Sequence, residues 1–451
     1  MKVKALSRST SDYVRERSSD IQRLPRNFDP ALHPFERARE YTRAVNAAKL
    51  ERMFAKPFLG AMDGHIDGVY TLSKHPWDLG SMISGSGDGE IRIWSLGSQK
   101  TVWKAPNAHK GIVQGVCPIP GNETDRFISV GFDKLVKIWS VHESGANTSG
   151  IPDPVATYSG KGLLSGVDHH RKKPQFATSS SCVEIWDVNR SEPISTLTWG
   201  ADTVNTVRMN QTETNVLASC GTDRTIILYD LRSNSPIVKL VQTLRTNAIS
   251  WNPMEAFIFA TANEDHNCYT FDMRRMNHAT NILKDHVSAV MDIDYSPTGE
   301  ELVSASYDRS IRLWNAREGK SRDIYHTKRM QRVFCARFSM DSKYVVSGSD
   351  DGNVRLWKAH ASERLGPKST RERNIIEYSE KLKERYQYLP QVRKILKNRN
   401  IPQPIKKVSK TKWTMIESQK RKEENRRKHS KPGSVPYVSE RKKSIVAVTS
   451  K

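Results

Sequence analysis

The chain has 451 residues, a formal net charge of +23 and a mean hydropathy of −0.63. No apolar run reaches the roughly 18 residues that a membrane-spanning helix needs, and no apolar segment follows the charged N-terminus as in a secretory signal. We therefore expect a soluble intracellular protein without a membrane partner. The five cysteines form no C-x-x-C pair, which argues against a disulfide framework or a structural zinc site and favours small buried strand residues.

The positive charge is concentrated at the two ends of the chain. Residues 359–451 carry 26 basic and 9 acidic side chains, whereas residues 55–358 carry 34 and 33. A basic extension beside a nearly neutral middle indicates a polyanionic partner. We expect a basic N-terminal arm over residues 1–56, a central domain over residues 57–358 and a basic C-terminal extension over residues 359–451.

Within the N-terminal arm, residues 1–30 are polar, and residues 34–54 predict a helix with Pro34 at its first position. One apolar stripe follows the helical period: Ala38, Tyr41, Val45 and Ala48. Four arginines lie off this stripe: Arg37, Arg39, Arg43 and Arg52. They are either solvated side chains of a helix packed on the neighbouring domain or contacts to phosphate, and the sequence leaves both open.

From His65 to Trp357 one pattern recurs seven times. Each unit has a tight turn and then a short strand of alternating apolar residues that ends in an aromatic residue. The aromatic ends are Trp94, Trp139, Trp186, Tyr229, Phe271, Trp314 and Trp357, at steps of 42 to 47 residues. A period of about 40 to 50 residues with one aromatic-ended strand per unit is typical of β-propeller blades.

Positions within each unit are fixed as well. Six residues before the aromatic stands an acid in six units: Asp88, Asp133, Asp223, Asp265, Asp308 and Asp351. Ten residues before it stands a hydroxyl, as at Ser84 and Ser347, and three units carry an upstream histidine: His65, His109 and His286. We expect the hydroxyl on the first strand of a hairpin, the acid in its turn and the aromatic on the return strand.

A histidine, a serine and an aspartate that recur together invite comparison with a nucleophilic triad. Repetition favours a network that braces each blade, because an active site is normally built once. The pattern resembles WD repeats. The unit ending at Trp186 has a short turn without the acid, so we expect it to be the least well braced. The units ending at Tyr229 and Phe271 have an altered network, and the last unit has no clear histidine.

The last repeat has no outer strand of its own after Trp357. We predict that residues 57–62 supply this strand, so that the ring closes between the two ends of the domain and leaves no open sheet edge. The longest connections, at residues 118–125 and 141–158, are where binding functions tend to lie.

In the C-terminal extension, residues 370–388 predict a helix, and Pro390 opens a second one. Residues 406–428 are very basic and form either a helix with almost no apolar stripe or a segment that stays extended until it meets a partner. The tail from Pro432 onward is expected to be an extended peptide.

The basic blocks of this extension are the candidate RNA contacts. Lysine and arginine bind phosphates without reading base sequence, and an aromatic side chain can stack on a base or dock on protein. The candidates are Lys406, Lys407, Lys410, Lys412, Trp413, Lys420, Arg421, Lys422, Arg426, Arg427, Lys428, Arg441, Lys442 and Lys443. A nuclear import signal is the alternative use of the same blocks.

Nearly the whole chain resembles the WD-repeat and SOF-domain-containing proteins. The N-terminal LHPFERAREY, the seven repeats and the C-terminal SERLGPKSTRERNIIEYSEKLKERYQYLP carry the resemblance, and the C-terminal part is the specific one. The resemblance implies a nucleolar factor of the small-subunit processome. Such a factor associates with pre-ribosomal RNA, a box C/D small nucleolar ribonucleoprotein and other processome proteins, and it supports 18S ribosomal RNA maturation.

Animal members of this family are also described as substrate receptors of the cullin-4 ubiquitin ligase, acting through an aromatic-Asp-x-Arg box after a repeat strand. Two such boxes occur here, with Asp230 and Arg232 in one and Asp272 and Arg274 in the next. The alternative is that the aspartate caps its own strand and the arginine is solvated. The expected fold is all-β, a seven-bladed WD-repeat β-propeller with basic helical or extended ends, and we expect a non-enzymatic protein without catalytic residues, cofactor or metal.

Overall fold

The computed structural model describes residues 30–76, 78–121, 126–141, 152–199 and 202–450. Residues 1–29 of the expected N-terminal arm, and residues 122–125 and 142–151 of the two long connections, lie outside the described residues. The chain divides into two compact units. The ring unit holds Pro57–Ala359 and Asn400–Lys451, and the helical unit holds Met1–Lys56 and His360–Arg399.

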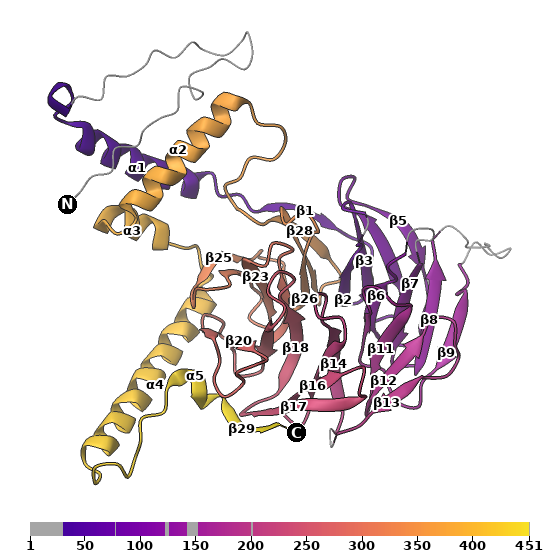
Figure 1. Ribbon diagram of the computed structural model, residues 1–451. Helices are drawn as coiled ribbons and strands as arrows, with labels where there is room; N and C mark the ends of the chain where they lie inside the picture. Colours follow the sequence, from indigo (N-terminus) through magenta and orange to yellow (C-terminus); the bar gives the residue numbers. More distant parts are fainter. Residues whose placement is uncertain (1–29, 77, 122–125, 142–151, 200–201, 451) are drawn as a thin grey trace. The chain divides into compact units, whose positions relative to one another are not determined.

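In the ring unit the described strands form seven antiparallel sheets, which are the blades of a β-propeller (Figure 1). The all-β, seven-bladed prediction is confirmed. Blades 1 to 3 consist of β2 (Val69–Lys74), β3 (Ser81–Ser86), β4 (Ile91–Ser95) and β5 (Lys100–Ala105); β6 (Val113–Pro118), β7 (Arg126–Gly131), β8 (Leu135–Ser140) and β9 (Ala156–Ser159); and β10 (Gly166–His169), β11 (Gln175–Ser179), β12 (Val183–Asp187) and β13 (Ser195–Leu197).

The remaining blades repeat this order, with the aromatic of each repeat on the third strand. Blades 4 to 7 consist of β14 (Val204–Met209), β15 (Val216–Gly221), β16 (Thr225–Asp230) and β17 (Ser235–Gln242); β18 (Thr246–Trp251), β19 (Ile258–Asn263), β20 (Cys268–Asp272) and β21 (Asn281–Leu283); β22 (Val290–Tyr295), β23 (Glu301–Ser306), β24 (Ile311–Asn315) and β25 (Ser321–Tyr325); and β26 (Val333–Phe338), β27 (Tyr344–Ser349), β28 (Val354–Lys358) and β1 (Phe58–Met62).

The turn between the second and third strands explains the fixed place of the acid. In blade 2 the Asp133 carboxylate accepts from the backbone N–H of Leu135 at 3.2 Å, and Lys134 between them has a φ of 63°. In blade 1 the residue after the acid is Gly89, with a φ of 87°. The acid accepts a hydrogen bond from the backbone amide two residues later. This bond compensates for the cost of the left-handed conformation of the residue between them.

Blade 7 is completed by a strand from the other end of the domain. β1 pairs antiparallel with β28, with Met62 opposite Val354, so residues 58–62 stand where the sequence places the closing strand. Met62 is 1% exposed and packs in one cluster with Val346 and Leu356. β1 therefore covers the outer edge of β28, and closure of the ring depends on both ends of the domain.

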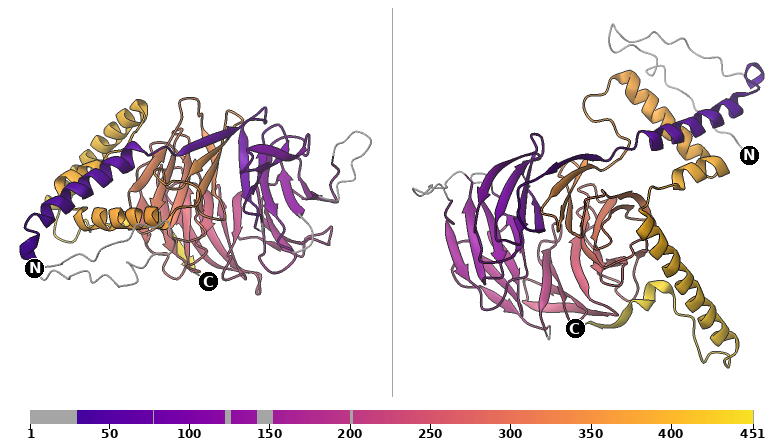
Figure 2. Two further views of the ribbon diagram at one scale, coloured as in Figure 1. Left: turned by 90° about the horizontal axis from the view of Figure 1, so that it is seen from above. Right: turned by 180° about the vertical axis from the view of Figure 1, so that it is seen from behind.

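The C-terminal part of the ring unit is ordered rather than a free tail. It forms α4 (Gln403–Lys428), the short helix α5 (Glu440–Lys443) and β29 (Ile445–Ser450). β29 pairs antiparallel with β17 and adds a fifth strand to blade 4, as the yellow C-terminal strand in Figures 1 and 2 shows. Of the two alternatives for residues 406–428, the helix is the one observed.

The helical unit consists of η2 (Pro30–Leu32), α1 (Glu36–Met53), α2 (Thr370–Tyr386) and α3 (Pro390–Lys397). Its buried core is Ala44, Val45, Ala48, Leu382 and Val392. Ala38, expected on the apolar stripe of the first helix, is exposed, and Ala44 takes its place. No described helix is both long enough and apolar enough to cross a membrane.

Ion pairs and hydrogen bonds tie the helices of this unit together. Lys383 and Glu51 lie 2.7 Å apart, and Arg52 donates to the Leu396 carbonyl at 2.6 Å. Arg43 donates to the Tyr378 hydroxyl at 3.3 Å. Two of the four arginines noted on the first helix therefore contact neighbouring helices.

Candidate interfaces for RNA and protein

A histidine–serine–tryptophan chain braces blade 2. His109 Nε2 lies 2.7 Å from Ser129 Oγ, which also accepts from Trp139 Nε1 at 2.8 Å. His109 Nδ1 lies 3.0 Å from the Asp133 carboxylate. Burial lowers the pKa of His109 although Asp133 opposes it, so a neutral ring that donates to the carboxylate fits the site.

Blade 6 repeats this chain with His286, Ser304, Asp308 and Trp314. His286 is fully buried, with Nε2 2.6 Å from Ser304 Oγ and Nδ1 2.8 Å from Asp308. Burial alone would raise the pKa of Asp308, but the neighbouring His286 and Arg312 outweigh it and lower the pKa. Two buried, fully paired copies in separate blades fit a bracing role, because a nucleophile needs access to substrate.

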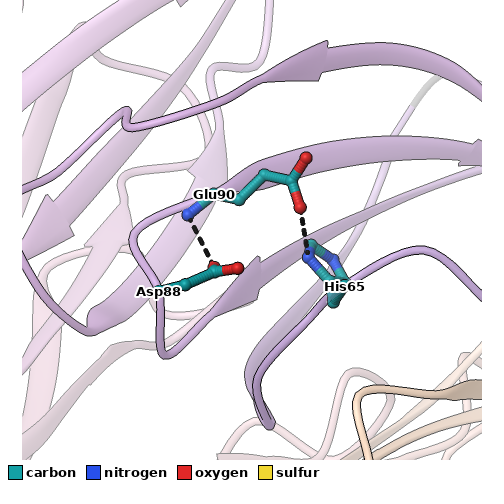
Figure 3. A group of neighbouring side chains, drawn as sticks. All are labelled: His65, Asp88 and Glu90. Atoms are coloured by element: carbon teal, nitrogen blue, oxygen red, sulfur yellow. Dashed lines mark hydrogen bonds and ion pairs between the residues drawn. The ribbon is translucent and has the colours of Figure 1, made fainter.

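Blade 1 departs from this scheme at the acid. His65 Nδ1 lies 3.2 Å from Glu90, and Asp88 instead accepts from the Glu90 backbone N–H at 3.1 Å (Figure 3). In this blade the histidine is therefore paired with Glu90 rather than with the turn acid, because the longer side chain of Glu90 reaches the ring. One ligand atom each of His65, Asp88 and Glu90 lie within 4.8 Å, yet Arg92 Nη2 stands 2.8 Å from Glu90 and supplies the positive charge, so we assign no metal there.

The blades without an upstream histidine use other partners for the acid. In blade 7, Trp357 Nε1 donates to Ser347 at 2.9 Å, and Arg355 Nη1 lies 3.1 Å from Asp351. In blade 5, the Tyr269 hydroxyl donates to Asp265 at 2.5 Å. In blade 4, Asp223 accepts from the Thr225 backbone N–H at 3.2 Å. The turn acid is thus kept while its side-chain partner changes.

Blade 3 has no turn acid and contains an unpaired carboxylate. Trp186 Nε1 donates to Thr178 Oγ1 at 2.9 Å, two residues closer along the chain than in the other blades, as its short turn predicts. Glu184 is 1% exposed, and neither carboxylate oxygen has a hydrogen-bond partner among the described residues. Burial raises the pKa of Glu184. Blade 3 therefore keeps the tryptophan–hydroxyl bond but has no acid in its turn.

The two Asp-x-Arg boxes follow the third strands of blades 4 and 5. Asp230 accepts from the backbone N–H of Arg232 at 2.9 Å, and Asp272 accepts from that of Arg274 at 3.0 Å. Each arginine also folds back onto its own aspartate, with Arg274 Nη2 2.8 Å from Asp272 and Arg232 Nη2 3.3 Å from Asp230. The amide of Arg232 lowers the pKa of Asp230, and the Arg274 side chain lowers the pKa of Asp272.

Both arginines of these boxes remain open to solvent. The Arg232 side chain is 73% exposed and that of Arg274 is 61% exposed, whereas their aspartates are mostly covered. Because all third strands run in the same direction around the ring, the two boxes lie on one rim and on neighbouring blades. In each box the aspartate caps its own strand, as the alternative interpretation of the sequence expected. The two exposed arginines are at the same time accessible to a partner.

One face of α4 is docked on the ring. Ile405 is buried, and Lys412, two turns further on, donates to the His286 carbonyl at 3.0 Å. Burial lowers the pKa of Lys412, with Asp265 and Asp308 opposing. Lys412 is one of the candidate RNA contacts, and in this structure its amine is directed into the ring unit.

Further contacts join the C-terminal half of α4 to the segment that returns from it. Lys420 lies 2.8 Å from Glu440, Lys443 lies 2.6 Å from Glu423, and the Arg427 guanidinium stands 4.9 Å from the ring centre of Tyr437. Lys284 on blade 5 also pairs with Glu440, and these lysines lower the pKa of Glu440 to about 2. Three more candidate RNA contacts, Lys420, Arg427 and Lys443, are therefore engaged internally.

The remaining candidates face solvent. Trp413 is 61% exposed, and the basic side chains that share its exposure are Lys406, Lys407, Lys410, Arg421, Lys422, Arg426, Lys428, Arg441 and Lys442. Lys407, Arg421 and Lys428 are separated by multiples of seven residues, so they share one side of the helix, away from Ile405 and Lys412. Among these candidates Lys428 also pairs with Glu424 at 2.9 Å. The structure therefore shows one candidate docked on the ring, Lys412, several that pair within the C-terminal segment, and others that only face solvent.

Several interacting residues were missed by the repeat pattern. Glu90 lies outside the six-residue offset, and Thr178 lies eight rather than ten residues before its aromatic. The pairing of β29 with β17 joins segments about 200 residues apart, and the only local signal was the β-branched run at Ile445–Ser450.

Comparison with known proteins decides the family. A Sof1-like domain matches residues 359–445, and WD domain G-beta repeats match residues 56–95, 191–230, 278–315 and 322–358. The chain is 52% identical to DDB1- and CUL4-associated factor 13 of Xenopus laevis over 99% of this chain and 100% of that protein. It is 49% identical to Protein SOF1 of Saccharomyces cerevisiae over 100% of this chain and 96% of that protein.

The chain belongs to the family of these proteins. The human DDB1- and CUL4-associated factor 13 is 51% identical over 99% of this chain and its own full length. The family resemblance expected from the N-terminal, repeat and C-terminal segments is confirmed. The Sof1-like match covers α2, α3, α4 and α5, so the family signature includes helices of both units.

Proposed function

We propose that this chain is a non-enzymatic factor of ribosome biogenesis that works in the small-subunit processome of the nucleolus. Its partners are pre-ribosomal RNA, a box C/D small nucleolar ribonucleoprotein and other processome proteins. The full-length relationship to Protein SOF1 supports this function, and the outward basic side of α4 is the observation that carries the RNA contact. The closed ring serves as a rigid scaffold for protein partners.

The outward side of α4 suits a nucleic-acid backbone rather than a base-reading contact. A helix of 26 residues is about 39 Å long, enough to follow several phosphates. Docking of Lys412 and the Lys420–Glu440 and Lys443–Glu423 pairs hold the helix in place before any partner arrives. Preorganisation of this kind lowers the entropy lost on binding.

Charge reversal at two places on the ring unit tests the RNA contact. The variant K407E/K410E/R421E changes three outward side chains of α4, and the control variant R171E/K172E/K173E changes three exposed bases on blade 3. Both variants lose the same charge, so a general electrostatic effect would weaken RNA crosslinking equally. We expect the α4 variant alone to lose crosslinking in cells and to reduce the salt slope of RNA binding by about 2 to 3. Equal loss in both variants, or none in the α4 variant, contradicts the proposal.

A second function is favoured by the two Asp-x-Arg boxes. As a substrate receptor of a cullin-4 ubiquitin ligase, the chain would bind the ligase adaptor through Arg232 and Arg274, which are exposed on neighbouring blades. The relationship to DDB1- and CUL4-associated factor 13 supports this role. Binding would replace each intramolecular arginine–aspartate pair with a pair across the interface, while the backbone caps at Asp230 and Asp272 keep the loops in shape.

The double variant R232E/R274E separates this role from the first. We expect it to lose co-purification with the ligase adaptor while RNA crosslinking stays at the wild-type level. The matched control is R190E/R317E, which reverses two exposed arginines next to corresponding strand ends of blades 3 and 6. Retained adaptor binding in R232E/R274E, or equal loss in the control, rejects the boxes as the contact.

A further inference from the structure

The C-terminal strap, residues 440–450, is held on blades 4 and 5 by strand pairing, by backbone hydrogen bonds at both ends of α5 and by the packing of two side chains. β29 pairs with β17 from Gln242 opposite Ile445 to Val238 opposite Ser450. Ile445 and Val448 pack against the buried cluster shared by the two blades. Because β29 lies at the edge of the blade 4 sheet, the strap can open by local unfolding without opening the ring.

Ser444 lies at the point where the strap turns from α5 into β29. It is 5% exposed, and its carbonyl accepts from the Thr243 backbone N–H at 3.0 Å. Its Oγ is buried against the Tyr269 hydroxyl without a hydrogen bond of normal geometry. The Tyr269 hydroxyl in turn donates to Asp265 at 2.5 Å. The Asp265 carboxylate therefore lies on the far side of Tyr269 from Ser444.

Three basic residues precede this serine: Arg441 and Lys442, which are exposed, and Lys443, which pairs with Glu423. Basic side chains two and three positions before a serine are what basophilic serine/threonine kinases bind in an acidic substrate cleft. The strap therefore presents a buried serine behind an exposed recognition sequence, and the serine becomes reachable when the strap opens.

We propose that Ser444 is a phosphorylation site for a basophilic kinase and that phosphoserine at this position keeps the strap off blade 4. In the reaction, Ser444 Oγ forms a bond to the γ-phosphorus of ATP as the bond to the β-phosphate oxygen breaks. The hydroxyl proton passes to the kinase's base, and ADP leaves. The proposal does not depend on RNA binding by α4.

The docked strap disfavours a phosphate on Ser444. A phosphoserine carries a charge of about −1.5 to −2 and three acceptor oxygens. In the docked state these would be buried beside Tyr269 and near Asp265, where desolvation and like charge oppose them. In the released state the phosphate is hydrated and can pair with the lysines before it. The modification therefore favours release.

Phosphorylation and hydrogen exchange on the full-length protein test both halves of the proposal. The protein is incubated with ATP and the catalytic subunit of cAMP-dependent protein kinase, and the site is located by peptide mass mapping. We expect phosphate on Ser444, none there in Ser444→Ala, less in Arg441→Ala, and faster labelling in Val448→Asp, which loosens the strap. Absence of phosphate on Ser444 even in Val448→Asp overturns the site.

The release is measured on Ser444→Glu and on the phosphorylated protein. Amides of residues 445–450 are expected to exchange at least about tenfold faster, while those of β19 keep their protection. Ser434→Glu is the matched control, since it adds the same charge at an exposed serine outside the strap. Unchanged exchange over 445–450, or an equal increase in Ser434→Glu, overturns the switch.

Discussion

Replacing Glu184 by glutamine tests whether blade 3 contains a destabilising carboxylate. Glu184 is buried on β12 without a hydrogen-bond partner among the described residues, and burial raises its pKa, with only Lys161 acting in the opposite direction. In four other blades the residue two before the aromatic is a base: Arg92, Lys137, Arg312 and Arg355. Glutamine keeps the shape of the side chain and removes the charge.

The direction of the pH dependence of stability follows from the raised pKa of Glu184 in the folded chain. The folded chain keeps the proton of Glu184 to a higher pH than the unfolded chain, whose value is near 4.5, so it binds more protons in that interval. Stability is present below the unfolded pKa and is lost as pH rises through the raised folded pKa. An unpartnered buried polar group costs about 1–3 kcal/mol and a charged one more, so the neutral amide of glutamine, itself unpartnered, should recover about 1–3 kcal/mol that the charge adds. With an unfolding entropy of roughly 0.6 kcal/mol/K for a ring of about 300 residues, Glu184→Gln should raise the Tm by about 2–5 K at high pH.

Differential scanning calorimetry at several pH values measures this effect. We expect the increase in Tm of Glu184→Gln over the wild type to be largest at about pH 8. The increase should vanish at about pH 4, where the wild-type carboxyl is protonated. Glu192→Gln, at an exposed position of the same blade, controls for the change in net charge. A lower Tm in Glu184→Gln at high pH, or a difference that does not vary with pH, would refute the reasoning.

Three further predictions concern the ring. Met62→Ala should lower the free energy of unfolding by about 2–4 kcal/mol in chemical denaturation, because it opens a cavity beside β28; the exposed Met53→Ala should have little effect. Asp308→Asn should cost about 2–3 kcal/mol at neutral pH, and the loss should fade as pH falls below 3.8 through the lowered pKa of Asp308; a loss that stays constant in acid contradicts this. Deleting residues 445–451 should speed hydrogen exchange at Val238–Gln242 by about tenfold while the ring keeps its Tm, and unchanged exchange there contradicts the pairing.

The ring could be predicted from the chain because its signal is local and repeated. A hydroxyl, a turn acid and an aromatic at fixed offsets describe one hairpin, and the structure places Ser129, Asp133 and Trp139 in that hairpin. A fixed offset cannot reveal that Glu90, just before β4, reaches His65 in place of Asp88. Which carboxylate reaches the histidine depends on side-chain length and on the folded geometry of the turn, which a sequence offset does not contain.

The C-terminal extension was harder to predict because its contacts are distant in the chain. The basic composition of residues 406–428 indicated a polyanion contact but not which side of the helix is free. Lys412 and Lys420 look identical to Lys407 in composition, and only the partners His286 and Glu440 separate them. An apolar face of one or two residues, such as Ile405, is too small to give a helical period.

Closure of blade 7 by β1 also has a consequence during synthesis on the ribosome. β1 emerges first, yet its partner β28 is made about 300 residues later, which takes about 15–60 s at the usual rate of translation. Until β28 is made, the backbone N–H and C=O groups of β1 have no strand to pair with. A factor that covers this strand during translation would protect the nascent protein from aggregation. A nonsense mutation before Val354 would leave β1 without its pairing strand β28.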